Sequence, residues 1–219
     1  MKRIVGICLL GMMVVSMSAS KPMRQWITAM PDSVLPLLTQ NDRLDFVDFL
    51  DSGMEAVVTN RLDGKSVMRV LTNDYTHVSY TKSMDVEMKL LPLTDTTDVL
   101  CMVTTVVSAG VGDSHITFFD ENWQVVPTDD YYIPPVMDDF LVDELPDSVV
   151  HVLDKMDVYF KTYHLDPEKD ELVCRLTTTD YLNTEDRKAV LPWVLSASRT
   201  YVWRNGKLES KVAEQLTKE

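Results

Sequence analysis

Apolar and polar side chains alternate most regularly in residues 84–107. The even-numbered residues from 84 to 90 are Met, Val, Met and Leu, whereas the odd-numbered residues from 85 to 89 are Asp, Glu and Lys. A repeat of two is typical of a β-strand with one buried face and one solvated face. After a polar turn, residues 99–105 (VLCMVTT) indicate a second strand. We predict an antiparallel hairpin with its core on the Met88 side and solvent on the Lys89 side.

A second stretch of the chain repeats this pattern. Residues 156–165 (MDVYFKTYHL) match residues 84–93 (MDVEMKLLPL) at Met, Asp, Val, Lys and Leu, and LVCRLTT later matches VLCMVTT. Each copy leads to a further strand that begins with Ser, and LPDSVVHVL repeats an earlier MPDSVLPLL with its helix-start signal. The sequence therefore predicts an α+β fold. It consists of two repeated helix-plus-antiparallel β-meander units that form antiparallel sheet, with the helices on one face.

The N-terminal residues have the pattern of a secretory signal peptide. Lys2 and Arg3 precede an apolar run over residues 4–15, and small polar residues follow up to Ser20. The apolar run is shorter than the roughly 18–20 residues of a membrane-spanning helix. We predict cleavage after Ser20 and an exported protein, periplasmic or extracellular, with no transmembrane segment after signal cleavage.

Changes of composition divide the chain into four parts. Residues 1–20 are the predicted signal peptide, and residues 21–127 are the first repeat with an inserted helix and hairpin. Residues 128–146, rich in Asp and Pro, are the predicted linker, and residues 147–219 are the second repeat.

Local signals place the remaining elements. Residues 31–33 (PDS) predict a helix start, and a second helix is predicted from residue 41, with Val47 on its apolar face and Arg43 on its polar face. Strands are predicted near residues 66–72 and 77–81, and Asn205-Gly206 is a strong hairpin-turn dipeptide between the last two strands.

The chain is acidic, with 34 Asp and Glu residues against 21 Lys and Arg, a net charge of −13. Removing Lys2 and Arg3 with the signal peptide makes it −15. This charge repels a phosphate backbone, so we predict no nucleic-acid partner. Cationic peptides or metal ions remain compatible partners, and solubility alone also explains an acidic surface.

Cys101 and Cys174 occupy equivalent strand positions in the two repeats. Each shares a strand face with apolar neighbours, which predicts two buried, unpaired thiols. A disulfide between them is the alternative in an oxidising compartment, and it requires the two strands to lie within about 7 Å.

No group of residues in the sequence predicts catalysis or metal binding. Residues 113–115 (Asp-Ser-His) contain the residue types of a hydrolase triad, but neighbours on a strand point to opposite faces. The four histidines have no metal-site spacing, and the acidic residues 129–144 lack the pattern of a calcium loop, which favours a solvated segment. We predict no catalytic residue, no cofactor and no metal.

One surface of the second repeat is a candidate for partner binding. Aromatic and basic side chains gather on the predicted polar face of its sheet, a combination enriched in protein interfaces. Coverage of this face by a helix is the alternative. The candidate partner residues are Tyr159, Lys161, Tyr163, Arg175, Tyr201 and Trp203.

Four segments resemble a family of exported Bacteroidales proteins of unknown function. They are MPDSVLPLLT (residues 30–39), RLDFVDFLDS (43–52), DGKSVMRVLTNDY (63–75) and TYVWRNGK (200–207). The resemblance implies export and a shared fold, and it implies no catalytic residues. The predicted duplicated meander is also similar to the β-lactamase-inhibitor-protein-like architecture, an analogy of fold alone.

These observations lead to one functional hypothesis and two alternatives. The hypothesis is a non-catalytic protein- or peptide-binding module of the cell envelope. The alternatives are a hydrolase whose site is dispersed along the chain, and a passive envelope component.

Overall fold

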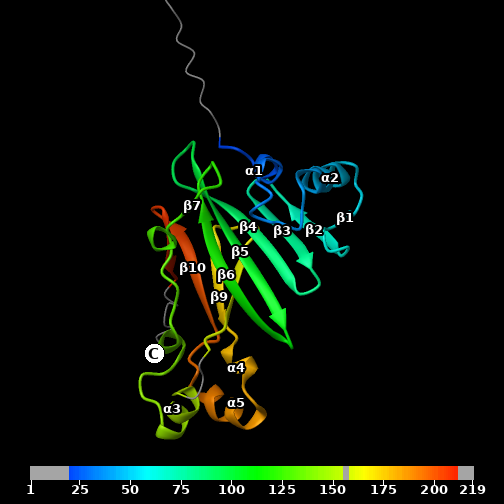
Figure 1. The fold of residues 1–219 in the computed structure, drawn as a ribbon. Helices are drawn as coiled ribbons and strands as arrows, with labels where there is room; N and C mark the ends of the chain where they lie inside the picture. Colours follow the sequence, from blue (N-terminus) through cyan, green and yellow to red (C-terminus); the bar gives the residue numbers. More distant parts are fainter. Residues whose placement is uncertain (1–19, 155–157, 212–219) are drawn as a thin grey trace, which may run out of the picture.

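The computed structural model describes residues 20–154 and 158–211, which form an α+β fold with two antiparallel sheets (Figure 1). The larger sheet has seven strands in chain order, so each strand pairs with its sequence neighbour. Its strands are β1 (Ala56–Thr59), β2 (Lys65–Leu71), β3 (Tyr75–Thr81), β4 (Met84–Pro92), β5 (Asp98–Ser108), β6 (Val111–Phe119) and β7 (Val125–Val126).

The smaller sheet has four strands in the order β11-β10-β9-β8, again a meander. Its strands are β8 (Lys161–Leu165), β9 (Glu171–Leu176), β10 (Ser198–Arg204) and β11 (Lys207–Ser210). The α-helices are α1 (Met23–Ala29), α2 (Gln40–Asp51), α3 (Asp147–Asp154), α4 (Thr178–Tyr181) and α5 (Thr184–Val190); the 3₁₀ helices are η1 (Thr128–Asp130), η2 (Met137–Phe140) and η3 (Leu191–Trp193). In the described part of the chain, no helix is both long enough and apolar enough to cross a membrane.

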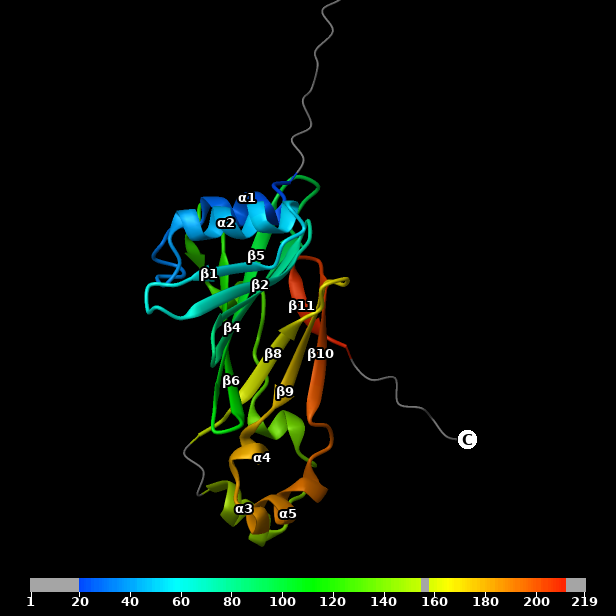
Figure 2. The same ribbon diagram turned by 90° about the vertical axis from the view of Figure 1, so that its right-hand side faces the viewer.

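The two faces of the larger sheet have different coverings. Helices α1 and α2 lie across one face and bury a core around Met88, Trp26 and Phe46 (Figure 2). The smaller sheet packs against the other face, where β8 contacts β4, β5 and β6. A second core lies between the sheets and includes Cys101 and Leu172. Helices α3, α4 and α5 gather at the end of the molecule away from α1 and α2.

The predicted strands are present, except that the strand expected over residues 156–165 begins at Lys161 and Met156 lies outside the described residues. The prediction that one face of β4 is solvated is wrong. Lys89 and Leu91, on that face, are each only 1% exposed, because the smaller sheet covers them. Alternation shows which side chains share a face. It does not show whether a second layer covers the polar face, since charged side chains can be buried when they find partners.

Side chains of the larger sheet cap the free edge of β8. The Lys161 amide donates to Asp113 Oδ1 at 3.3 Å, and the Tyr163 amide donates to Ser114 Oγ at 3.0 Å. Both acceptors stand on β6. An edge strand normally exposes a row of unpaired amides, so these contacts protect the edge and hold the two sheets together.

Glu87 on β4 supplies the next acceptor along the same edge. Its Oε2 accepts the Leu165 amide at 2.7 Å, and its Oε1 lies 2.8 Å from His164 Nδ1. The hydrogen bond to the Glu87 carboxylate raises the pKa of His164. A single carboxylate therefore joins β4 to both the main chain and a side chain of β8.

Lys89 extends this polar seam to the turn between β8 and β9. Its ammonium lies 2.8 Å from Asp74 Oδ2 and 3.8 Å from Asp170 Oδ1, and it donates to the Pro167 carbonyl at 3.3 Å. These partners compensate the cost of removing the charge from water.

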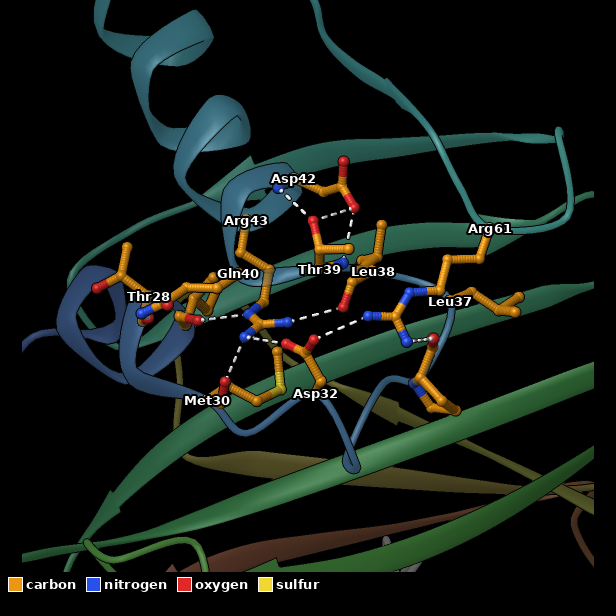
Figure 3. A network of polar contacts seen from close by, with 12 residues as sticks. Thr28, Met30, Asp32, Leu37, Leu38, Thr39, Gln40, Asp42, Arg43 and Arg61 are labelled. Carbon is orange, nitrogen blue, oxygen red and sulfur yellow. Dashed lines mark hydrogen bonds and ion pairs between the residues drawn. The ribbon is translucent and has the colours of Figure 1, made fainter.

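A second buried charge organises the N-terminal segment. Arg43 is 1% exposed, so its predicted place on the polar face of the helix is wrong. Its guanidinium donates to the carbonyls of Ile27, Leu38 and Met30 and pairs with Asp32 at 3.0 Å (Figure 3). Arg43 joins α2 to the chain before it, because main-chain carbonyls that are not paired within a helix remain free to accept.

The predicted helix start at residues 31–33 is also wrong, because that segment forms successive turns. Asp32 pairs with Arg43 and Arg61 instead of capping a helix. The helix before it, α1, was not predicted. Helix α2 begins one residue before its predicted start, where Thr39 and Asp42 form a reciprocal capping box.

Gly112 allows β6 and β8 to approach closely, which gives a first prediction. A β-carbon at this position would lie 2.7 Å from Thr162 Cγ2. We expect Gly112→Ala to lower the free energy of unfolding by about 1–3 kcal/mol, measured by urea denaturation. Thr162→Ser removes the obstructing methyl group, so the substitution should cost much less in that background. An equal cost in both backgrounds would show that the close approach is not responsible.

The pair formed by His164 and Glu87 predicts a pH dependence of stability. Because the folded pKa of His164 is raised, its contribution is complete below the unfolded pKa of about 6.5 and is lost as pH rises through the folded pKa. The difference in unfolding free energy between the wild type and His164→Gln should therefore be larger at about pH 5.5 than at about pH 8.5. In a Glu87→Gln background this pH dependence should disappear. A constant difference in the wild-type background would contradict the assignment.

Candidate functional site

Three of the six candidate partner residues lie in the core between the sheets. Tyr163, Tyr201 and Trp203 are 4%, 5% and 9% exposed. The prediction that they form an exposed aromatic surface is therefore wrong, since the face judged polar is the buried one. The cover is the larger sheet and the 128–146 segment rather than a helix.

The other three candidate residues remain partly accessible and lie at two separate places on the surface. The Tyr159 hydroxyl donates to the Pro135 carbonyl at 3.0 Å, and the Lys161 ammonium lies 4.2 Å from the centre of the Tyr159 ring. Arg175 is exposed and pairs with Asp180 at 3.0 Å. The structure thus divides the predicted patch between the core and two surface contacts.

The buried tyrosines form a cluster with a residue that the sequence analysis assigned to the linker. Tyr132 packs edge-to-face on Tyr163 and Tyr201, with ring centres 5.8 and 5.0 Å apart. The hydroxyl groups of Tyr132 and Tyr163 have no hydrogen-bond partner in the described part of the chain. Burial raises the pKa of all three phenols, so they stay neutral at physiological pH. The cluster forms a rigid apolar wall.

The prediction of two buried, unpaired thiols is confirmed for Cys101 and Cys174. Burial raises the pKa of the Cys174 thiol to about 12 and raises that of Cys101 further. Both thiols are therefore protonated and weakly nucleophilic, which argues for a packing role.

A groove of about 420 Å³ lies on the outer side of this wall, between residues 131–135 and the strands β10 and β11. Tyr132, Tyr201 and Leu208 line it. Ile133, which also lines the groove, is 78% exposed. The volume falls within the range of ligand and peptide sites, and the lining is mainly aromatic and aliphatic.

The position of the groove follows from how the 128–146 segment meets β11. The Leu208 amide donates to the Tyr131 carbonyl at 2.8 Å, and Tyr132 forms a parallel bridge with Leu208. Residues 134–135 are both Pro and have no amide hydrogen, so they cannot continue the pairing. The segment is fixed again where Arg199 donates to the Asp139 carbonyl. The groove is the space left between these two attachments.

A second hollow, of about 400 Å³, lies beside Lys89. Asp74, Asp98 and Asp170 line it, and burial raises the pKa of Asp98 and Asp170. None of its lining residues is a histidine. Among the described residues, no group of three His, Cys, Asp or Glu side chains is placed to hold a metal ion.

Residues 113–115 do not form a triad. Asp113 and Ser114 accept the amides of β8, and Ser114 Oγ also lies 2.7 Å from Thr105 Oγ1. The groove could not be predicted from the sequence, because its walls come from the segment predicted to be a solvated linker and from the last hairpin. The aromatic residues Tyr131 and Tyr132 within that acidic stretch were the signal that it packs.

Two tyrosines of this region give a matched prediction. We expect Tyr159→Phe to cost about 0.5–1.5 kcal/mol of unfolding free energy, because it removes the hydrogen bond to Pro135. Tyr163→Phe should be neutral or stabilising, because its buried hydroxyl has no partner among the described residues. Chemical denaturation of both variants tests this. A larger loss for Tyr163→Phe would show that its hydroxyl is hydrogen-bonded in solution.

Comparisons with known proteins agree with this architecture. A solved structure, "Structure of a domain of an uncharacterized protein from Porphyromonas gingivalis W83", is 24% identical to this chain. The match covers 89% of this chain and 100% of that one, with a TM-score of 0.79, and it shows a shared fold. No curated protein matched. The family described as "Protein of unknown function (DUF3256)" matches residues 14–208, so the chain belongs to that family.

Proposed function

We propose that this protein is an exported component of the cell envelope that binds another protein without catalysing a reaction, and that the groove beside β11 is its contact site. The observation that carries the proposal is an apolar groove whose rim is left exposed. Ile133, which lines the groove, is 78% exposed, although it is a large apolar residue next to a packed core. Exposed apolar side chains at the edge of a groove are a mark of interaction sites.

The lining of the groove supports binding rather than chemistry. Tyr132 and Tyr201 are neutral and held by packing, and the Arg199 guanidinium is engaged by the Asp139 carbonyl. Rigid aromatic side chains supply contact area at a low cost in conformational entropy. Such a wall favours a partner that inserts apolar side chains.

The hydrolase alternative gains no specific support from the hollow beside Lys89. Two of its three carboxylates, Asp74 and Asp170, already hold the Lys89 ammonium, and none of its lining residues is a histidine. A general acid and base with separated pKa values, together with a nucleophile within reach, would be needed for hydrolysis.

Export is supported by the basic start, apolar run and small-residue end of residues 1–20. Residues 1–19 lie outside the described part of the chain. The acidic composition is compatible with a soluble envelope protein whose partner carries basic residues.

A pull-down with matched variants tests the proposal. Mature protein, residues 21–219, would be immobilised and exposed to envelope extract at about 0.15 M salt and at higher salt. The comparison would include Ile133→Asp, at the groove, and Leu62→Asp, a 71% exposed apolar residue in the turn between β1 and β2. Both sites are exposed, so neither substitution should disturb folding.

We expect one stoichiometric partner that survives the higher salt, is retained by Leu62→Asp and is lost with Ile133→Asp. Salt resistance indicates a packed contact instead of long-range attraction between charges. Equal capture by both variants would contradict the groove as the contact site, and capture of no partner would contradict the proposed function.

A further inference from the structure

We propose that the groove binds an extended, basic segment of the partner that adds as a strand beside β11. This inference rests on the proposed function and specifies the chemistry of the partner. It follows from the register of the last hairpin, the unequal protection of the two edges of the smaller sheet, and the charges around the groove.

The register of the hairpin shows which groups of β11 face outward. Lys207 pairs with Arg204 across a two-residue turn, and the Lys211 amide donates to the Thr200 carbonyl. Antiparallel pairs alternate between hydrogen-bonded and non-hydrogen-bonded positions. Leu208 and Ser210 therefore direct their amide and carbonyl groups away from β10, toward the side of the groove.

The protein protects its two sheet edges unequally. Side chains of Glu87, Asp113 and Ser114 cap three amides of β8. On β11, the Leu208 amide donates to the Tyr131 carbonyl, and the parallel bridge to Tyr132 engages the Leu208 carbonyl as well. Within the described part of the chain, the outward amide left without a main-chain partner is that of Ser210. An uncapped edge is a template for an added strand.

The segment that already lies beside β11 shows how far such pairing extends. It pairs only at Tyr132 and then reaches Pro134 and Pro135, which donate no hydrogen bond. The groove opens where this pairing stops, and Ser210 is one of its lining residues. A partner strand would continue the pairing from there and place alternate side chains against the aromatic wall.

Charge selects a basic segment. Three acidic residues line the groove, Asp129, Asp139 and Glu209, against two basic ones, Arg199 and Lys207. Arg199 already donates to the Asp139 carbonyl. With a net charge of −13 over the whole chain, the local and the overall field both attract cations.

Synthetic peptides test the inference on the mature protein. The probe is the basic peptide acetyl-KVTVKV-amide, compared with its acidic counterpart acetyl-EVTVEV-amide and with acetyl-KVPVKV-amide, in which proline removes a strand amide. Amide NMR shifts report the site, and a titration gives the affinity. We expect the basic peptide to shift Leu208, Ser210 and Ile133 and to bind about tenfold more tightly than either control.

A pair of variants separates strand addition from simple contact with the groove. Ser210→Pro removes the outward amide at an exposed edge position, whereas Ser210→Ala keeps it. We expect loss of peptide binding only with Ser210→Pro, with the amide spectrum of the rest of the protein unchanged. Binding that is equal for the acidic peptide, or unaffected by Ser210→Pro, would overturn the inference.

The outcomes distinguish this inference from the proposed function. An envelope partner that depends on Ile133 but is insensitive to Ser210→Pro would overturn strand addition and leave the proposed function intact. Absence of any partner in the pull-down would overturn the proposed function itself.

Discussion

The capping of one strand edge by side chains of another sheet determines the shape of this protein. Three acceptors, Glu87, Asp113 and Ser114, bind the outward amides of β8 and so hold the smaller sheet against β4 and β6 of the larger one. Individual hydrogen bonds of this kind contribute about 1 kcal/mol, but an unmade buried bond costs more. The position of β9, β10 and β11 follows through their pairing, and so does the place of the groove.

Two buried cationic side chains, Lys89 and Arg43, also hold separate segments of the chain together. Each is 1% exposed and is surrounded by carboxylates or main-chain carbonyls. The partners of Arg43 come from the segment just before α2, whereas Lys89 also reaches the turn between β8 and β9. A buried ion pair adds little net stability compared with apolar packing, yet removing one partner typically costs about 3–5 kcal/mol. Such residues therefore fix which segments meet more than they strengthen the fold. The surface-exposed carboxylates Asp32 and Asp74 at their ends reduce that cost.

The local sequence pattern was sufficient to predict most strands, but it was insufficient to predict which of their faces are buried. The hairpin of β4 and β5, the turn at Asn205-Gly206 and helix α2 were all predicted from periodicity and turn residues. The wrong predictions concern coverage, because the polar face of β4 and the face of Tyr163 are buried by a layer that no local pattern encodes. The duplication of the two hairpins stays a prediction. For the same reason, the candidate site is the groove beside β11 and not the exposed sheet face that the sequence predicted.

The meander order of both sheets has a consequence for how the chain assembles as it is synthesised. Every strand pairs with its neighbour in sequence, so each sheet forms through short-range contacts that close rapidly. The larger sheet with α1 and α2 has a complete core before β8 emerges, but its other face presents Leu91 and Phe118 without cover until then. The emerging C-terminal half thus acts as the first binding partner of the N-terminal half, and any factor that holds the unfinished chain meets that bare face first.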